Sequence, residues 1–114
     1  MSDLSEKKCI PCEGGALSLE FNEIHKYLKK VDGWDVKSNK EKNYFLEKEF
    51  KFKNFKNSQA FVNKVGEIAE NENHHPDILF GWGYTKIKIF THAIKGLAES
   101  DFILAAKIDK ISSD

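Results

Sequence analysis

Pro76 separates two stretches of the chain that have different hydrophobic periods. Before it, apolar residues recur at the spacing of one buried helical face, which predicts a helix from a cap at Asn54 to about Glu70 or Asn71. This stripe consists of Phe61, Val62, Val65, Ile68 and Ala69. After Pro76 the run YTKIKIF alternates between two faces, as a half-buried strand does. Because proline cannot continue a helix and disfavours the α conformation in the residue before it, the chain must change from helix to strand here.

Two further helices are expected, one on each side of this central region. Apolar residues at helical spacing predict a helix over residues 18–31 that ends at Asp32-Gly33. Its buried face consists of Phe21, Ile24, Leu28 and Val31, with His25 at the edge as a packing or surface residue. The last helix follows a turn at Gly96, and its cap is expected at Ser100 or Asp101 because Ala98 has no side-chain acceptor.

Four strands complete the expected elements. Residues 34–36 and 43–52 predict a hairpin whose strands are joined by a polar turn. Residues 77–92 predict two strands, or one long bent strand, with Gly81 and Gly83 at the flexible point. The order α-β-β-α-β-β-α predicts an α+β domain in which a four-stranded antiparallel sheet carries three helices on one face.

The bulk composition narrows the class of protein. A chain of 114 residues is long enough for one domain, which we expect over residues 17–114, after a flexible polar leader at 1–16. Its 18 basic and 18 acidic side chains balance, so no excess charge attracts nucleic acid or an anionic membrane surface. No apolar run approaches the roughly 18 residues of a membrane span, and the N-terminus lacks a signal-peptide core, so the expected location is the cytoplasm.

The leader contains both cysteines, Cys9 and Cys12, in the sequence Cys-Ile-Pro-Cys. Such a pair is a candidate redox centre, because this spacing lowers the pKa of a thiol. A redox pair usually follows a strand and opens a helix, whereas here Glu-Gly-Gly follows a polar tail. A zinc site needs two more ligands at a recognisable spacing, and the chain has no second cysteine pair. We therefore expect two reduced, inert thiols.

Three of the four histidines gather around the expected helix–strand junction: His74, His75 and His92. A metal site would need these imidazoles to converge on one ion, but the His-Glu-x-x-His spacing is absent, so no metal is expected. A second interpretation is that the three side chains merely fill the junction. A third is proton transfer, because an imidazole titrates near neutral pH. Two imidazoles can protonate one atom while deprotonating another, as the elimination of water requires.

A longer pattern contains these histidines. Glu70 is followed at fixed spacings by His74-His75-Pro76, Trp82, His92 and Asp101, and the similarity continues in THAIKGLAESDFILAAKID, Gly33-Trp34 and FKFKNFKNSQAF. Over about residues 20–111 the chain resembles the pterin-4a-carbinolamine dehydratases. The resemblance implies a hydro-lyase that dehydrates 4a-hydroxytetrahydrobiopterin to quinonoid dihydrobiopterin, which recycles the cofactor of aromatic amino acid hydroxylases. It also implies that the dehydratase needs no metal or organic cofactor.

The resemblance further implies roles for individual residues. His74 and His92 would be the acid/base pair, and His75 would complete the catalytic histidines. The residues expected to orient these imidazoles or to contact the pterin are Glu70, Asn73, Pro76, Thr91, Asp101 and Trp34. In this chain Asn73 stands where some members have Asp, and Ile78 stands where the animal proteins have Trp.

Two alternative functions stay open at this point. Animal members also act as a dimerisation partner of a homeodomain transcription factor, which implies a non-catalytic binding module. The second alternative is a pterin-binding relative in molybdenum cofactor metabolism. The expected partners are a small-molecule pterin and further copies of the chain, in a homodimer or homotetramer that protects the open sheet edges. Direct binding to nucleic acid or to a membrane is not expected.

Overall fold

The structure, a computed structural model, describes residues 4–6 and 18–112. Its helices and strands follow one another in the predicted order. The helices are α1 (Phe21–Leu28), α2 (Phe55–Glu72) and α3 (Glu99–Ser112). The strands are β1 (Asp35–Ser38), β2 (Tyr44–Lys51), β3 (Asp77–Gly81) and β4 (Tyr84–Ile89). Two short 3₁₀ helices are η1 (Leu4–Glu6) and η2 (His92–Ile94). The order α-β-β-α-β-β-α is therefore confirmed.

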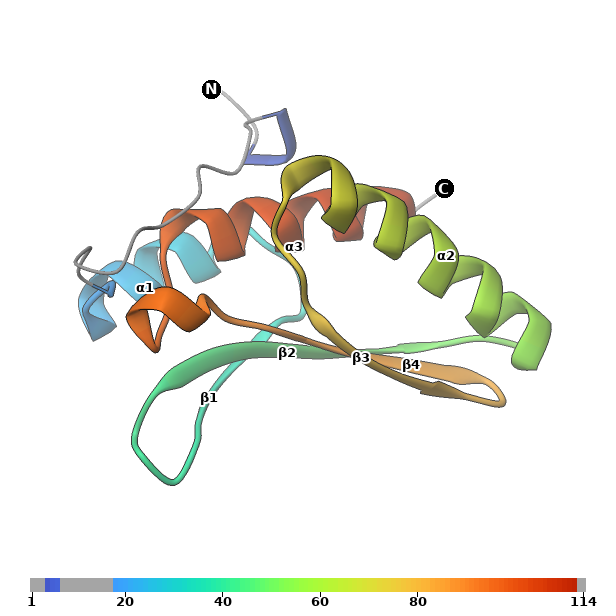
Figure 1. Cartoon of the computed structure of the whole chain (residues 1–114), viewed down its shortest axis with the longest axis horizontal. Coiled ribbons are helices and arrows are strands. Elements are labelled where there is room, and N and C mark those ends of the chain that lie inside the picture. Colours follow the sequence, from blue (N-terminus) through green and yellow to red (C-terminus); the bar gives the residue numbers. More distant parts are fainter. Residues whose placement is uncertain (1–3, 7–17, 113–114) are drawn as a thin grey trace.

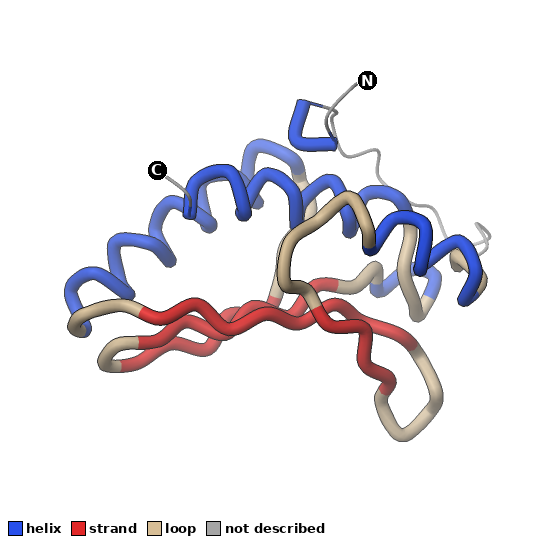
Figure 2. Tube along the Cα trace, turned by 180° about the vertical axis from the view of Figure 1, so that it is seen from behind, coloured by secondary structure: helices blue, strands red, loops and turns tan. Residues whose placement is uncertain are grey.

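The four strands form one antiparallel sheet in the order β1-β2-β4-β3. Figures 1 and 2 show the three helices layered over one face of this sheet, while the β1–β2 hairpin bends away from them. The alternation in β4 explains the arrangement, because Thr85, Ile87 and Ile89 are fully buried beneath the helices. Lys86 and Lys88 lie between them in sequence and point to the uncovered face. The predicted α+β class is confirmed.

Helix α3 is the most deeply buried of the helices. Its side chains Phe102, Leu104 and Ile108 are fully buried, and the residues between them are also buried or nearly so. Side chains buried on most sides of a helix are typical of a core position. Tyr27 of α1 stacks on Phe102 with the ring centroids 5.2 Å apart. A polar residue near the start of this helix, Asp101, is therefore placed inside the core.

Helix α1 is shorter than the helix predicted over residues 18–31. The Leu19 N–H donates to the carbonyl of Leu97 at 2.7 Å, and this contact holds Leu19 outside the helix. The carboxylate of Glu23 accepts the N–H of Glu20 at 3.2 Å, which caps the helix where it begins. After Leu28 the chain continues only in single turns up to Gly33, whose φ is +74°.

Part of the predicted leader contacts the domain. Leu4 is only 4% exposed and belongs to the hydrophobic core. Lys107 of α3 donates to the carbonyl of Ser5 at 2.7 Å, so η1 is held against α3. Cys9 and Cys12 lie outside the described residues, and the interpretations of this pair stay predictions. Among the described helices, none is long and apolar enough to cross a membrane.

Candidate active site

The C-terminus of α2 fixes the direction in which His74 leaves the helix. Asn73 adopts the left-handed conformation, with φ 52° and ψ 40°. Its N–H donates to Glu70 O at 3.2 Å, and the His74 N–H donates to Ala69 O at 3.1 Å, which is the Schellman pattern. Asparagine is one of the few non-glycine residues that enter this conformation readily. The helix thus ends at Glu72, slightly beyond the predicted end.

The register of β3 and β4 brings the distant histidines together. Asp77, the first residue of β3, pairs with Lys88 near the end of β4. Because the two strands are antiparallel, the chain before Asp77 runs beside the chain after Lys88. The segment His74–Pro76 therefore lies next to Phe90–His92. The two parts of the sequence pattern meet at this end of the sheet.

Asp101 connects the end of α2 and the segment after β4 through hydrogen bonds. Its side chain is fully buried in α3. One carboxylate oxygen lies 2.7 Å from Nε2 of His74. The other oxygen accepts from the hydroxyl of Thr91 at 2.7 Å and from the Ala98 N–H at 2.8 Å. A buried carboxylate needs such donors, because removing an unpaired charge from water costs several kcal/mol or more.

The contact with Asp101 assigns the tautomer of His74. A carboxylate only accepts hydrogen bonds, so the proton of the neutral imidazole must reside on Nε2. Nδ1 of His74 then carries the free lone pair. The side chain of His74 is 14% exposed, which leaves the ring at the border between the core and solvent. This imidazole can take up a proton at Nδ1 while a buried anion stabilises the charge that results.

The start of α3 differs from the predicted cap. The helix begins at Glu99, so Ala98 occupies the N-cap position, and the cap does not move to Ser100 or Asp101. Asp101 is the third helical residue, and its carboxylate accepts the Ala98 N–H. This contact supplies half of a capping box, which removes the need for a side-chain acceptor at Ala98. The prediction missed it because it considered only acceptors at the cap itself.

His75 has a different environment from its neighbour. Its Nε2 lies 2.6 Å from Oε1 of Glu70, which belongs to the last turn of α2. Both side chains are exposed, at 57% for His75 and 79% for Glu70. A pair in contact with solvent contributes little to stability. The imidazole is oriented by Glu70 but remains accessible to a ligand.

His92 begins η2, immediately after the buried Thr91. Its ring lies 4.2 Å from the ring of Phe90, measured between centroids, and no other residue in the described part of the chain contacts the imidazole through a hydrogen bond or ring. The side chain is exposed and lines a cavity of about 260 Å³ next to the end of β4. Neither His74 nor His75 lines this cavity. Of His74, His75 and His92, only His92 therefore lines the cavity.

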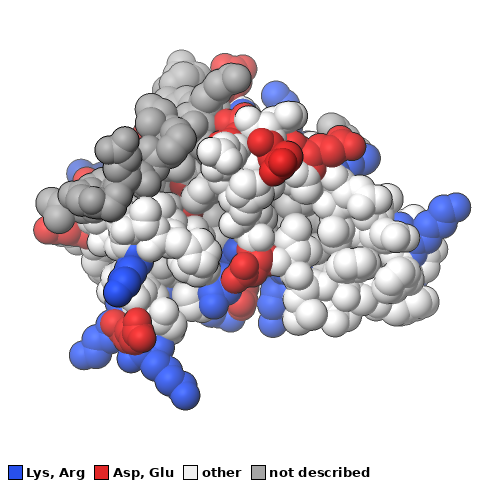
Figure 3. All heavy atoms as spheres, viewed as in Figure 1, with Lys and Arg blue, Asp and Glu red and all other residues white. Residues whose placement is uncertain are grey.

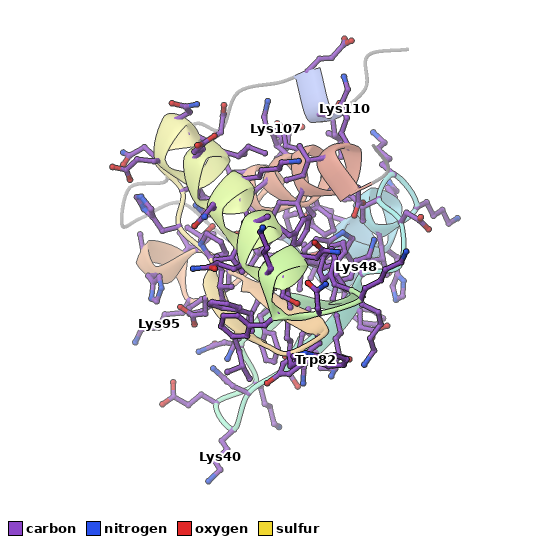
Figure 4. The ribbon with its side chains drawn as sticks, turned by 90° about the vertical axis from the view of Figure 1, so that its right-hand side faces the viewer. Lys40, Lys48, Trp82, Lys95, Lys107 and Lys110 are labelled. Atoms are coloured by element: carbon purple, nitrogen blue, oxygen red, sulfur yellow. The ribbon has the colours of Figure 1, made fainter. Side chains whose placement is uncertain are left out.

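The two tryptophans of the sequence pattern lie elsewhere. Trp34 is 4% exposed, and its Nε1 donates to Asp109 at 2.8 Å. Asp109 follows Asp101 by eight residues on α3, a distance of about 12 Å along the helix axis. Trp82 is 71% exposed in the β3–β4 turn, at the opposite end of β4 from His92 (labelled in Figure 4). The structure does not bring either ring to the histidines.

The remaining predicted positions lie around the junction itself. Pro76 is half-buried between His75 and the first residue of β3. In the described part of the chain, no three His, Cys, Asp or Glu side chains group closely enough to hold a metal ion. Burial raises the pKa of Tyr27, and a hydrogen bond to Glu99 at the start of α3 raises it further. The arrangement offers two accessible imidazoles and one imidazole fixed by a buried carboxylate.

Comparison with known proteins identifies the family of this chain. The family model of pterin 4 alpha carbinolamine dehydratase matches residues 18–111. A protein of Rubrobacter xylanophilus named "Putative pterin-4-alpha-carbinolamine dehydratase" is 48% identical over 97% of this chain and 100% of its own length. A protein of the same name from Alkaliphilus metalliredigens is 49% identical over the full length of both chains.

Two solved structures share the fold. The crystal structure of a transcriptional coactivator/pterin dehydratase from Brucella melitensis has a TM-score of 0.74 and 28% identity, covering 82% of this chain and 97% of that one. A pterin dehydratase-like protein described as a RuBisCO assembly factor in the alpha-carboxysome has a TM-score of 0.61 and 25% identity, covering 72% and 92%. By the family model and by full-length similarity, the chain belongs to the pterin 4-alpha-carbinolamine dehydratase family.

Proposed function

We propose that this protein dehydrates 4a-hydroxytetrahydrobiopterin to quinonoid dihydrobiopterin, with His74 and His92 as its acid/base pair. Such a reaction would recycle the cofactor of aromatic amino acid hydroxylases. Membership of the dehydratase family supports the pterin carbinolamine as the class of substrate. The observation that carries the mechanism is the buried Asp101, which binds His74 directly and holds Thr91 next to His92.

The reaction requires two proton transfers. The bond between C4a and the hydroxyl oxygen breaks, the proton leaves N5, and the electron pair of the N5–H bond forms the new double bond between N5 and C4a. Hydroxide leaves poorly unless it is protonated, so an acid must act at the oxygen and a base at N5. Each transfer by a positioned side chain contributes about 10²- to 10⁴-fold to the rate.

His74 is suited to the role of base. Its Nδ1 carries the free lone pair, because Nε2 donates to Asp101 at 2.7 Å. When Nδ1 takes the N5 proton, the imidazolium forms beside a carboxylate that is already fixed by Thr91 and Ala98. The anion therefore stabilises the charged ring without rearrangement, which lowers the barrier. Asp101 and Thr91 act as positioning residues.

His92 is suited to the role of acid. Its imidazole is exposed, so it can regain a proton from solvent after each turnover. The proton that it gives to the hydroxyl leaves with the water molecule, and His74 returns the N5 proton to solvent. Both histidines then regain their starting states.

The other site residues bind the substrate or position His74 and His92. His75, held by Glu70 at 2.6 Å, contacts the substrate and contributes mainly to binding. Asn73 and Pro76 fix the path of the chain on both sides of the two histidines. Trp34 has no role in the proposed site, because its indole is bound to Asp109 at 2.8 Å.

The test is turnover of synthetic carbinolamine by single and double histidine variants. We expect His74→Ala and His92→Ala each to lower kcat at least about tenfold, with the fold intact. The slow spontaneous dehydration must be subtracted before the variants are compared. His25→Ala is the matched control, since this histidine lies on α1 and its ring contacts that of Phe21, with the centroids 4.3 Å apart. Near-normal turnover by the His74/His92 double variant would refute the acid/base assignment.

A binding module is the second candidate function. Leu79 and Trp82 of the β3–β4 hairpin are 59% and 71% exposed, and large exposed apolar side chains favour a protein contact. The two solved relatives described as a coactivator/dehydratase and as an assembly factor show that the fold occurs in proteins with such descriptions. A folded protein without measurable turnover would favour this candidate over the enzyme.

A further inference from the structure

The cavity beside His92 is not lined by His74 or His75. It forms between the β1–β2 connection (residues 39–43) and the end of β4, on the side where the hairpin bends away from the helices (Figure 1). Phe45 and Phe90 supply apolar walls, and His92 also lines the cavity. Its volume is about 260 Å³. Since a water molecule occupies about 30 Å³ in the liquid, the cavity has room for a substituent of several heavy atoms.

Two lysines and one carboxylate give this cavity an excess positive charge. The lining includes Lys88 and Lys95, against Glu41 alone among acidic residues. Lys88 Nζ lies over the ring of Phe45, 4.2 Å from its centroid, and over that of Phe90 at 5.6 Å. These aromatic contacts place the ammonium group inside the apolar part of the wall. An anion that enters the cavity would therefore meet a positioned cation.

Neither lysine is neutralised by an ion pair within the described residues. The carboxylates closest to Lys88 in register are Glu47 on β2 and Asp77 on β3. Glu47 is bound to Lys37 at 2.6 Å instead. Lys95 closes the η2 turn and points outward from it (Figure 4).

The surface around the cavity is also rich in positive charge. Figure 3 shows more Lys and Arg than Asp and Glu at the lower left, where the β1–β2 connection lies in Figure 1. The connection contains Lys40 and Lys42, which do not line the cavity, so variants must separate their contribution from that of the two lysines in the wall.

The chemistry of the substrate relates the cavity to the reaction. In a pterin, the ring carbon C6 is bonded directly to N5, and C6 carries the variable substituent. A base and an acid that act at N5 and C4a must therefore stand close to that substituent. His92 belongs both to the proposed acid/base pair and to the cavity wall. With the C4a hydroxyl at His92, C6 is only two bonds from C4a, so its substituent would lie within reach of the cavity.

We infer that the cavity between residues 39–43 and the end of β4 binds an anionic C6 substituent, so that the protein takes pterins with a carboxylate or phosphate at this position. The inference rests on the proposed function for the placement of N5. Lys88 and Lys95 contact the anion, and Phe45 and Phe90 pack against the atoms that join it to the ring. A neutral substituent fits the same space but lacks these charge contacts.

Equilibrium binding of stable, fluorescent pterins tests this inference on the full chain. The probes are 6-carboxypterin, 6-hydroxymethylpterin and the phosphate monoester of 6-hydroxymethylpterin. We expect the anionic probes to bind about tenfold more tightly than the neutral one, with the difference shrinking as salt is added. The stronger of the two anionic probes shows whether carboxylate or phosphate is the natural group.

Matched lysine variants locate the effect. Lys88→Met keeps the aliphatic stem, and Lys95→Asn suits the left-handed conformation at φ 51°. Each should reduce the preference for the anionic probes to about threefold or less. The controls are Lys86→Met on the same face of β4, and Lys42→Asn, whose φ is 64°. Neither control residue lines the cavity, so each should change the preference less than the two wall lysines do.

The outcomes separate this inference from the proposed function. Equal affinity for anionic and neutral probes, or an equal effect of all four lysine variants, would overturn the inference. Lysine-dependent preference in a protein that turns over no carbinolamine would support the cavity and refute the dehydratase proposal. Turnover of a neutral carbinolamine without any preference for anionic probes would support the dehydratase proposal and refute the role of the cavity. Thermal denaturation of each variant confirms that the binding data come from folded protein.

Discussion

Asp101→Asn should abolish most of the turnover while it leaves the fold intact. The replacement has nearly the same shape, but an amide has one acceptor oxygen and one donor NH₂ group. The native carboxylate receives donors on both oxygens, from His74 on one and from Thr91 and Ala98 on the other. The Ala98 N–H can only donate, so the amide oxygen must face Ala98 and Thr91. The NH₂ group then faces His74.

This orientation changes the tautomer of His74. Its Nε2 must accept from the amide, so the proton of the neutral ring moves to Nδ1 and the lone pair needed by the base is lost. The anion that stabilises the imidazolium is lost as well. We expect kcat to fall by about 10²- to 10⁴-fold, the range associated with a misplaced or missing general base. The exchange of one charged hydrogen bond should lower the free energy of unfolding by about 1.5–3 kcal/mol.

The assay combines turnover, stability and a direct view of the ring. Carbinolamine dehydration gives kcat, urea denaturation gives the free energy of unfolding, and ¹⁵N NMR of labelled histidine reports which ring nitrogen of His74 carries the proton. Asp109→Asn is the control, because this aspartate on the same helix accepts from Trp34 and Lys48 at 2.8 and 2.9 Å. It should lower stability without lowering kcat. A folded Asp101→Asn protein with kcat within threefold of the parent would refute the positioning argument.

Four other outcomes are expected. His75→Ala should raise KM more than it lowers kcat, and the opposite pattern in steady-state kinetics would contradict the binding role of His75. Sedimentation should give a mass at least twice 13.1 kDa, because open strand edges favour pairing. A monomer at micromolar concentration would exclude the predicted assembly. Turnover should persist in excess chelator, and elemental analysis with about one metal per chain, together with activity lost on its removal, would count against acid/base catalysis by histidine alone. Burial and the hydrogen bond to Glu99 raise the pKa of Tyr27 in the folded protein. The protonated phenol therefore contributes its full stabilisation below about pH 10, and this contribution is lost as the pH rises through the folded-state pKa. Denaturation of Tyr27→Phe at high pH should show a smaller loss of stability than that of the parent.

Capping and periodicity correctly predicted those features of the helices and strands that depend on residues close by in sequence. Asn54 caps α2 as expected, and its side chain accepts from the Asn57 N–H at 2.8 Å. The alternation of β4 predicted which of its side chains are buried. The start of α1 was wrong because it depends on the contact of Leu19 with Leu97, which lies far away in sequence. The first strand begins at Asp35 and not at Trp34, whose indole is held by Asp109 of the distant helix α3. It ends at Ser38, two residues beyond the predicted end.

The site shows the same division between local and distant causes. The sequence pattern places three histidines near one junction, but it does not say how their rings are aimed. Two turns decide that direction, and each contains a left-handed residue, Asn73 at φ 52° before His74 and Lys95 at φ 51° after His92. Asparagine signals such a turn in the sequence, whereas lysine does not.

The hydrogen bonds of Asp101 then select one geometry from those that the turns permit. This residue receives its donors from the exit of α2, from the segment after β4 and from its own helix start. Its burial is stable only when all three segments are in place, because an unpaired buried carboxylate is costly. The same requirement that completes the core therefore orients His74. We conclude that in this fold the position of the proposed base is a consequence of how the buried start of α3 is satisfied.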